Sequence, residues 1–308
     1  MIQIDNLTKM YGKFTALKNL SFEVPRGTVF GFVGPNGAGK STTMTILSTL
    51  LAPTSGKAYV GGLDVLKYPK QVKKLIGYMP DFFGVYDNLK TDEYLNFYGS
   101  AYGLTADERS HIIPQLLELV NLSHKANENV DSLSRGMKQR LGLARCLVHD
   151  PEVLILDEPA SGLDPRARIE LREILKELRN MGKTIIISSH ILPELAELSD
   201  SIGVIEDGQM VAIGSMGEIS QRMRGHKLIK VRLLDQWEEV MQTLSENPYI
   251  TAVEREGQYL VAGFNGSEHE QANLLNQLIR ANYPLVAFSE TEGNLEDIFL
   301  EITKGVGS

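Results

Sequence analysis

The chain has 308 residues, of which 43% are hydrophobic and 23% are charged, with a net charge of −8 and one cysteine. This length predicts two domains, and the composition is typical of a globular protein with a sizeable core. The acidic balance argues against a general nucleic-acid-binding surface, and a single cysteine excludes a disulfide framework. The sequence has no apolar run of ~18 residues, the minimum for a transmembrane helix, and no signal-peptide pattern. We therefore expect a cytoplasmic protein.

The first 33 residues have the pattern of short strands, expected at 2–7, 17–24 and 28–33. Tyr11 is expected in a polar connection after the first of them. An aromatic ring at this place could stack on an adenine, or it could be a partly buried loop tyrosine. Without the motifs further along the chain, the loop tyrosine is the favoured interpretation.

A glycine-rich segment follows, Gly34-Pro-Asn-Gly-Ala-Gly39-Lys40-Ser41, with the spacing G-x-x-x-x-G-K-[ST]. A strand-like run precedes it and a helical pattern follows it, which is the context that a phosphate-binding P-loop requires. Backbone N–H groups of such a loop point at a polyphosphate, and the helix N-terminus adds a positive dipole end. We expect Lys40 to reach the β and γ phosphates and the Ser41 hydroxyl to bind Mg²⁺. The predicted nucleotide contacts in this segment are Gly34, Asn36, Gly37, Ala38, Gly39, Lys40, Ser41 and Thr42.

Residues from about 87 to 150 turn helical and interrupt the α/β pattern, which predicts an inserted helical subdomain. Pro114 is expected near the start of one of its helices, where the first turn tolerates proline. Ser134 is a good N-cap for the helix behind it. Its hydroxyl, Gly136 and the free helix N-terminus together suggest a second anion site, although an ordinary capped helix would give the same pattern.

Two adjacent carboxylates, Asp157 and Glu158, follow the apolar run at 153–156, which predicts a parallel strand buried on both faces. Open α/β sheets bind ligands at this end of their strands. We expect Asp157 to hold Mg²⁺, directly or through water, and Glu158 to polarise an attacking water. A purely structural pair is disfavoured because buried charges are costly without a cation. The next buried strand, 184–189, ends in His190, which is placed to touch a γ-phosphate.

In this order the segments resemble the nucleotide-binding domain of ABC transporters. The resemblance covers about residues 1–220 and rests on the P-loop, the sequence Leu133-Ser134-Arg135-Gly136-Met137, the strand ending in Asp157-Glu158, the Asp164 loop and His190. It implies an α/β P-loop NTPase fold with an antiparallel β subdomain and the inserted helical subdomain.

The resemblance also implies an ATP hydrolase that uses Mg²⁺. In that family two domains pair head to tail around two ATP molecules. Ser134, Arg135 and Gly136 of the signature sequence would then contact ATP bound to the partner chain, and Asp164 would lie in a loop at the dimer interface.

Three further roles are implied by the match. Tyr11 corresponds to the adenine-stacking aromatic, Glu158 to the catalytic base and His190 to the γ-phosphate contact. The implied partners are a transmembrane permease and a second ATPase subunit, with a homodimer favoured over a heterodimer and no nucleic acid. The chain would then be peripheral on the inner face of the plasma membrane.

Two positions depart from the family pattern. Asp81 stands where the family has a glutamine, and we expect it to make only a water-mediated or conditional contact with Mg²⁺. Arg135 and Met137 replace the usual glycine and glutamine of the signature, which leaves the cap itself intact. The aromatic segment 81–86 is either a small satellite core or a groove for a permease helix, and we favour the groove.

The C-terminal part follows a linker at 214–226. Strands are expected at 228–234, 250–254, 259–262 and 285–288, and helices at 237–244, 269–280 and 295–303. This β-α-β-β-α-β order predicts a small ferredoxin-like α+β domain. We therefore predict an ATPase domain at 1–217, with its helical subdomain at about 87–150, and an accessory domain at 218–308.

The ending 294–300 resembles the tail of exporter-type ATPase subunits, so the resemblance as a whole implies the ATPase subunit of an exporter. The alternative is a soluble ABC ATPase that acts on ribosomes or nucleic acid. The single nucleotide domain, the acidic balance and the lack of a long coiled-coil insertion disfavour it. A regulatory module with little turnover is a third possibility, which Glu158 and His190 argue against.

Overall fold

The computed structural model describes residues 1–82, 84, 88–191, 195, 197–215, 217–219 and 227–291. The chain divides into two compact units, Met1–Met216 and Gly217–Ser308. Each unit has a hydrophobic core of its own. In the described ranges no helix is both long enough and apolar enough to cross a bilayer.

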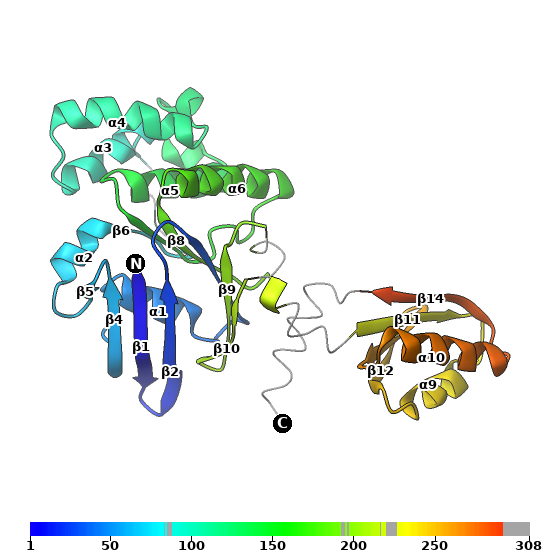
Figure 1. Cartoon of the computed structure of the whole chain (residues 1–308). Coiled ribbons are helices and arrows are strands. Elements are labelled where there is room, and N and C mark those ends of the chain that lie inside the picture. Colours follow the sequence, from blue (N-terminus) through cyan, green and yellow to red (C-terminus); the bar gives the residue numbers. More distant parts are fainter. Residues whose placement is uncertain are drawn as a thin grey trace. The chain divides into compact units, whose positions relative to one another are not determined.

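A six-stranded sheet forms the centre of the first unit (Figure 1). In spatial order its strands are β10 (Gln209–Gly214), β9 (Ser201–Glu206), β3 (Val29–Val33), β8 (Thr184–Ser189), β7 (Val153–Leu156) and β6 (Ile76–Met79). All neighbours pair in parallel except β10, which is antiparallel to β9. Every residue of β3, β7 and β8 is buried, as expected for strands covered on both faces. The carboxyl ends of these three strands therefore lie side by side.

An antiparallel sheet packs against this centre. Its strands, in spatial order, are β2 (Phe14–Val24), β1 (Ile2–Tyr11), β4 (Ser55–Val60) and β5 (Leu63–Asp64). Phe22 of β2 stacks on Phe30 of β3 with 5.0 Å between the ring centroids, so the two sheets share one core. The predicted antiparallel β subdomain is confirmed.

The helices pack on the sheets or form the predicted helical subdomain (Figure 1). The first, α1 (Lys40–Leu47), follows β3 and contacts β2 and β4. The helical subdomain consists of α3 (Thr91–Ala101), α4 (Ala106–Leu119), α5 (Arg135–Leu147) and the 3-10 turns η1 (Ser123–Lys125) and η2 (Val130–Ser132). Because α5 contacts α3, α4, α6 (Pro165–Asn180) and β6, it joins the helical subdomain to the central sheet.

Two local expectations are wrong. Pro114 does not lie near a helix start, because α4 already begins at Ala106 behind a capping box formed by Thr105 and Glu108. Pro114 is therefore inside the helix, where it cannot donate a backbone hydrogen bond. Tyr11 is not in a polar connection either, because β1 runs on to Tyr11 and pairs there with Phe14 of β2. Three short or edge elements, α2 (Pro69–Leu75), β5 and β10, are not among those predicted from the sequence.

The second unit has the predicted ferredoxin-like order. Its elements along the chain are β11 (Lys227–Leu233), α9 (Trp237–Ser245), β12 (Ile250–Glu256), β13 (Tyr259–Phe264), α10 (Glu268–Arg280) and β14 (Leu285–Thr291). The strands form an antiparallel sheet in the spatial order β12-β13-β11-β14. Alternate residues of β11, beginning with Ile229, face Val240 of α9 and Leu274 of α10 in the core. The helix expected at 295–303 and most of the expected linker lie outside the described residues.

Candidate active site

The P-loop connects β3 to α1 as predicted. Gly37 and Gly39 have φ values of 86° and 109°, which favour glycine. A β-carbon on Gly39 would also lie 2.6 Å from Leu17 Cδ2 and 2.8 Å from the Ala16 carbonyl oxygen. Glycine at this position therefore lets the loop turn tightly enough to present backbone N–H groups at the start of α1.

The other predicted loop residues take different places. Gly34 and Ala38 are buried, Asn36 is exposed at the tip with Gly37, and Thr42 is half-buried in the first turn of α1. Ala38 donates its N–H to the Pro35 carbonyl at 3.2 Å, which holds the loop closed on itself.

Lys40 lies inside the loop, with a side chain that is only 5% exposed. Its Nζ donates to the Gly34 carbonyl at 2.6 Å and to the Pro35 carbonyl at 3.2 Å, and lies 3.4 Å from Glu158 Oε1. The P-loop cation and the proposed catalytic carboxylate thus face each other directly.

Asp157 occupies the end of β7, where it is 3% exposed. Ser188 Oγ, at the end of β8, donates to Asp157 Oδ1 at 2.6 Å. Burial raises the pKa of the Asp157 carboxyl, hydrogen bonds from Ser188 and Ser41 lower it, and the negative charges of Glu158 and Asp81 raise it further. A carboxylate held in this way gains from a cation close by.

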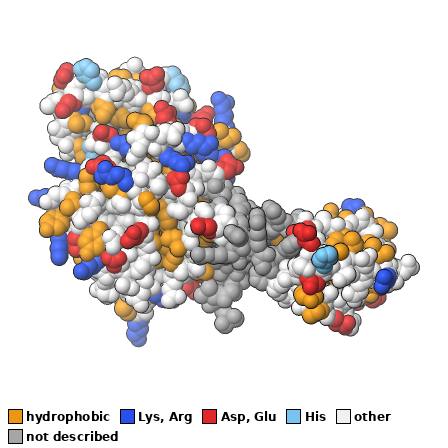
Figure 2. All heavy atoms as spheres, in the orientation of Figure 1, with side chains coloured by type: hydrophobic (Ala, Val, Ile, Leu, Met, Phe, Trp, Pro, Cys, Tyr) orange, Lys and Arg blue, Asp and Glu red, His pale blue; other side chains and the backbone are white. Residues whose placement is uncertain are grey.

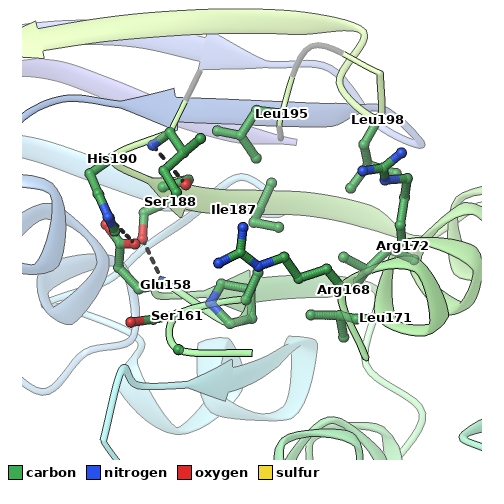
Figure 3. A pocket seen from close by; sticks show the side chains of 16 residues that line it. Glu158, Ser161, Arg168, Leu171, Arg172, Ile187, Ser188, His190, Leu195 and Leu198 are labelled. Carbon is green, nitrogen blue, oxygen red and sulfur yellow. Dashed lines mark hydrogen bonds and ion pairs between the residues drawn. The ribbon is translucent and has the colours of Figure 1, made fainter. Parts of the chain in front are cut away.

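Glu158 is positioned by the same serine, whose Oγ accepts the Glu158 N–H at 2.8 Å. Its Oε2 lies 2.8 Å from His190 Nδ1. Figure 3 shows the two side chains pointing toward each other. Glu158 adopts φ 48°, a left-handed conformation that costs a non-glycine residue about 1 kcal/mol. Strain of this kind is common at functional sites, and here it accompanies a carboxylate placed between Lys40 and His190.

Ser188 is the member of this hydrogen-bonded group that sequence reasoning misses. In the sequence it is only one of two serines before His190. The signal is spatial, because the parallel pairing of β7 with β8 sets Leu156 beside Ile187 and so brings the next residues, Asp157 and Ser188, together.

Tyr11 and Asp81 lie outside this hydrogen-bonded group. Tyr11 is 48% exposed, and Lys9 Nζ lies 5.2 Å from the centre of its ring. Asp81 follows β6 and is exposed, and its negative charge raises the pKa of Asp157 across the site. Within the aromatic segment, Phe82 is 88% exposed, whereas Phe83 and Tyr86 lie outside the described residues.

The signature sequence forms a separate cleft. Ser134 Oγ accepts the Met137 N–H at 3.3 Å and caps α5, while Asp164 Oδ1 accepts the Ala167 N–H at 3.0 Å and caps α6. A cavity of about 560 Å³ lies between these helix starts, and Ser134, Gly136 and Asp164 line it. No P-loop residue lines this cavity, so one chain does not join the signature to its own Lys40 there.

The residues around Asp157 fit a magnesium ion. The Ser41 hydroxyl lies near enough to the Asp157 carboxyl to lower its pKa, so two hard oxygen ligands already lie together. Mg²⁺ is often held by one or two carboxylates and otherwise by substrate phosphates and water. Among the described residues there is no group of three or more His, Cys, Asp and Glu side chains that could hold a metal without such a substrate.

The comparisons with known proteins agree with this geometry. The family model for ABC transporters matches residues 17–161, and the model for the C-terminal domain of DrrA1-3-like ATP-binding proteins matches residues 214–303. The linearmycin resistance ATP-binding protein LnrL of Bacillus subtilis is 35% identical over 305 residues, 98% of each chain. The bacitracin transport ATP-binding protein BcrA of Bacillus licheniformis is 35% identical over 309 residues, 99% of this chain and 98% of its own.

A solved structure adds a dimeric relative. The ATP-binding cassette MJ0796, in a dimeric post-hydrolysis state with ADP and Pi, matches with a TM-score of 0.64 and 26% identity over 70% of this chain and 99% of its own. The chain belongs to the ATP-binding proteins of ABC transporters, and it is an ATP hydrolase of that family. The predicted family, fold class and enzyme class are confirmed.

Proposed function

We propose that the chain is the ATPase subunit of an exporter, which binds Mg-ATP between the P-loop of one copy and the signature of a second. The observation that carries this proposal is the separation of two half-sites. Lys40 and Glu158 face each other at one, while Ser134 and Gly136 line a cleft without P-loop residues. In a head-to-tail pair, the P-loop half-site of each copy would lie against the signature half-site of the other. The dimer would then hold two complete sites.

The chain's own residues supply binding and positioning. Lys40 exchanges its bonds to the Gly34 and Pro35 carbonyls for phosphate oxygens, because a charge-assisted bond to an anion is stronger than one to a neutral carbonyl. Ser41 and Asp157 would hold Mg²⁺, which would supply positive charge to neutralise the phosphates. Asp81 would make only a water-mediated or conditional contact with it.

Glu158 orients the attacking water and accepts its proton. Its Oε1 is buried without a hydrogen-bond partner among the described residues, so it keeps accepting capacity. His190 holds the other carboxylate oxygen at 2.8 Å and is exposed enough to reach a γ-phosphate. Tyr11 stacks on the adenine, since its ring is exposed at the end of β1.

The second copy completes the site. Ser134, Arg135 and Gly136 contact the γ-phosphate from across the interface, and Asp164 lies in the loop between the two sites. A homodimer is favoured because one chain carries both half-sites.

The other partner is a transmembrane permease, which would hold the chain at the inner face of the plasma membrane. The named functions of LnrL and BcrA, antibiotic resistance and bacitracin transport, support an export role, and both match almost the whole chain. Basic and acidic side chains are interspersed over the visible face of the first unit (Figure 2), which supports the expectation that nucleic acid is not a partner.

The test compares ATP turnover of the purified chain with that of Glu158→Gln, together with size-exclusion chromatography in Mg-ATP. We expect turnover by the wild type, and loss of turnover with accumulation of an ATP-bound dimer for the variant. A Glu158→Gln protein that still hydrolyses ATP at the wild-type rate would refute the assigned role of Glu158.

A further inference from the structure

The guanidinium group of Arg135 lies against the loop that precedes α6. A β-carbon on Gly162 would overlap the Arg135 Nη1, Cζ and Nη2 atoms at nearly equal distances, so the flat face of the guanidinium covers the glycine. Gly162 has φ 65°, which already favours glycine. A β-carbon on Gly136, the next residue of α5, would lie 2.9 Å from the Ala167 Cβ of α6, so the two helix starts are packed closely together.

Within the part of the chain that the structure describes, Arg135 makes no hydrogen bond or ion pair, so no counter-charge in that part accompanies this contact. Arg135 is also the first residue of α5, where the positive dipole end disfavours a cation and favours an anion. An exposed guanidinium without a counter-charge at this position is suited to bind phosphate, which its planar fork matches with two hydrogen bonds.

The loop that Arg135 covers leads directly to Glu158. The Ser161 N–H donates to the Glu158 carbonyl at 3.0 Å, and the Leu163 N–H donates to the Ala160 carbonyl at 3.2 Å. The segment from Glu158 to Leu163 therefore consists of two overlapping hydrogen-bonded turns. A movement of Gly162 is therefore passed to the backbone of Glu158, the proposed catalytic base, through these two hydrogen bonds.

We propose that Arg135 is a positioning residue that couples the two ATP sites of a dimer. It covers Gly162 while the signature cleft holds no phosphate, and it turns to the γ-phosphate when ATP on the second copy arrives. The loop 161–164 is then released, so capture of ATP at one site speeds the step in which Glu158 of the other site takes its working position. The inference rests on the proposed head-to-tail dimer. It adds that, within one chain, a change at Arg135 of the signature is passed to Glu158.

The test measures ATP saturation curves for the wild type, Arg135→Gly, Arg135→Lys, Gly162→Ala and the double variant Arg135→Gly/Gly162→Ala. We expect Arg135→Gly to raise KM for ATP about tenfold, the effect of losing a charged hydrogen-bonded partner. It should also reduce the Hill coefficient from above 1 to 1. Arg135→Lys should restore part of the affinity because it keeps the charge.

The double variant separates coupling from packing. Gly162→Ala displaces the Arg135 guanidinium and should therefore change the Hill coefficient. In the Arg135→Gly background, Gly162→Ala should change the Hill coefficient no further. Such non-additivity is expected of two residues in contact. Lys138→Gln, one turn along α5 and paired with Asp131 at 3.8 Å, is the matched loss of charge and should leave the Hill coefficient unchanged.

Two outcomes overturn the inference in different ways. If the wild type dimerises in ATP but Arg135→Gly keeps its KM and Hill coefficient, Arg135 does not couple the sites, although the proposed function stands. If the chain with Glu158→Gln does not dimerise in ATP at all, the head-to-tail proposal fails and the coupling fails with it.

Discussion

At the scale of single residues, the site is held together by Ser188. One hydroxyl donates to Asp157 and accepts the Glu158 N–H, so the proposed metal ligand and the proposed catalytic base are fixed by the same side chain. The carboxylates themselves can be predicted from the sequence, because two acidic residues at the end of a buried strand are costly unless a cation lies nearby. The role of Ser188 cannot be predicted in this way, because it depends on which strand lies next to β7.

The raised pKa of Asp157 leads to a prediction about stability. Since burial favours the protonated form in the folded state, folding stability is lost as pH rises from the unfolded pKa through the raised folded pKa. At neutral pH the ionised carboxylate therefore destabilises the nucleotide-free protein. Asp157→Asn removes the charge and keeps an oxygen for Ser188, and it should raise the free energy of unfolding by about 1 kcal/mol at pH 7.

Urea unfolding between pH 4 and 8 tests this prediction. The gain in the free energy of unfolding of Asp157→Asn should shrink towards about pH 4, where Asp157 of the wild type is increasingly protonated in both the folded and the unfolded state. Mg²⁺-dependent ATP hydrolysis should be lost throughout. A variant that is less stable than the wild type at pH 7 would contradict the account of this carboxylate.

At the scale of elements, the most accurate predictions concern segments with one clear physical requirement. Buried parallel strands such as β7 and β8 are continuous apolar runs, and the P-loop needs glycine at defined positions. The sequence does not predict the helix α2, because Val72 is its one buried residue and it lacks an apolar face. Nor does it predict the edge strand β10, whose pairing with β9 is visible only in the fold.

The helix α4 shows where a local rule fails. A proline is typical of a first helical turn, but the Thr105 capping box sets the start at Ala106, well before Pro114. The interior proline therefore leaves the Ser110 carbonyl without its usual helical donor. Pro114→Ala should raise the free energy of unfolding by about 1 kcal/mol, because part of the larger proline penalty is offset by a more flexible unfolded chain.

The control for this substitution is Gln115→Ala at the exposed neighbouring position, which should change the stability by less than about 0.5 kcal/mol. Chemical denaturation with a circular dichroism signal is the measurement. A clear loss of stability for Pro114→Ala would mean that the proline ring contributes more to packing than its missing N–H costs.

At the scale of the whole molecule, two cores imply two folding units. Each of the units Met1–Met216 and Gly217–Ser308 buries its own apolar residues, so we propose that they are separate domains. Calorimetry of the full chain should give two unfolding transitions. Adding Mg-ATP should raise the midpoint temperature of only the transition that belongs to the first unit. A single transition that shifts as a whole would contradict this division.

The pairing of two copies is the central claim at this scale. In a head-to-tail dimer, a site is built from the P-loop of one chain and the signature of the other. Lys40→Ala destroys the first half-site and Ser134→Arg blocks the second, so neither variant should hydrolyse ATP alone. In a mixed dimer, however, the P-loop of the Ser134→Arg chain meets the intact signature of the Lys40→Ala chain.

The most direct measurement is therefore the ATP turnover of an equimolar mixture of these two inactive variants. The account predicts recovery of up to about a quarter of the wild-type turnover, since half of the dimers are mixed, each has one intact site, and that site lacks the acceleration by a second bound ATP. If the mixture stays as inactive as its components while both variants still dimerise, the active site is not shared between chains, and the proposed mechanism is wrong.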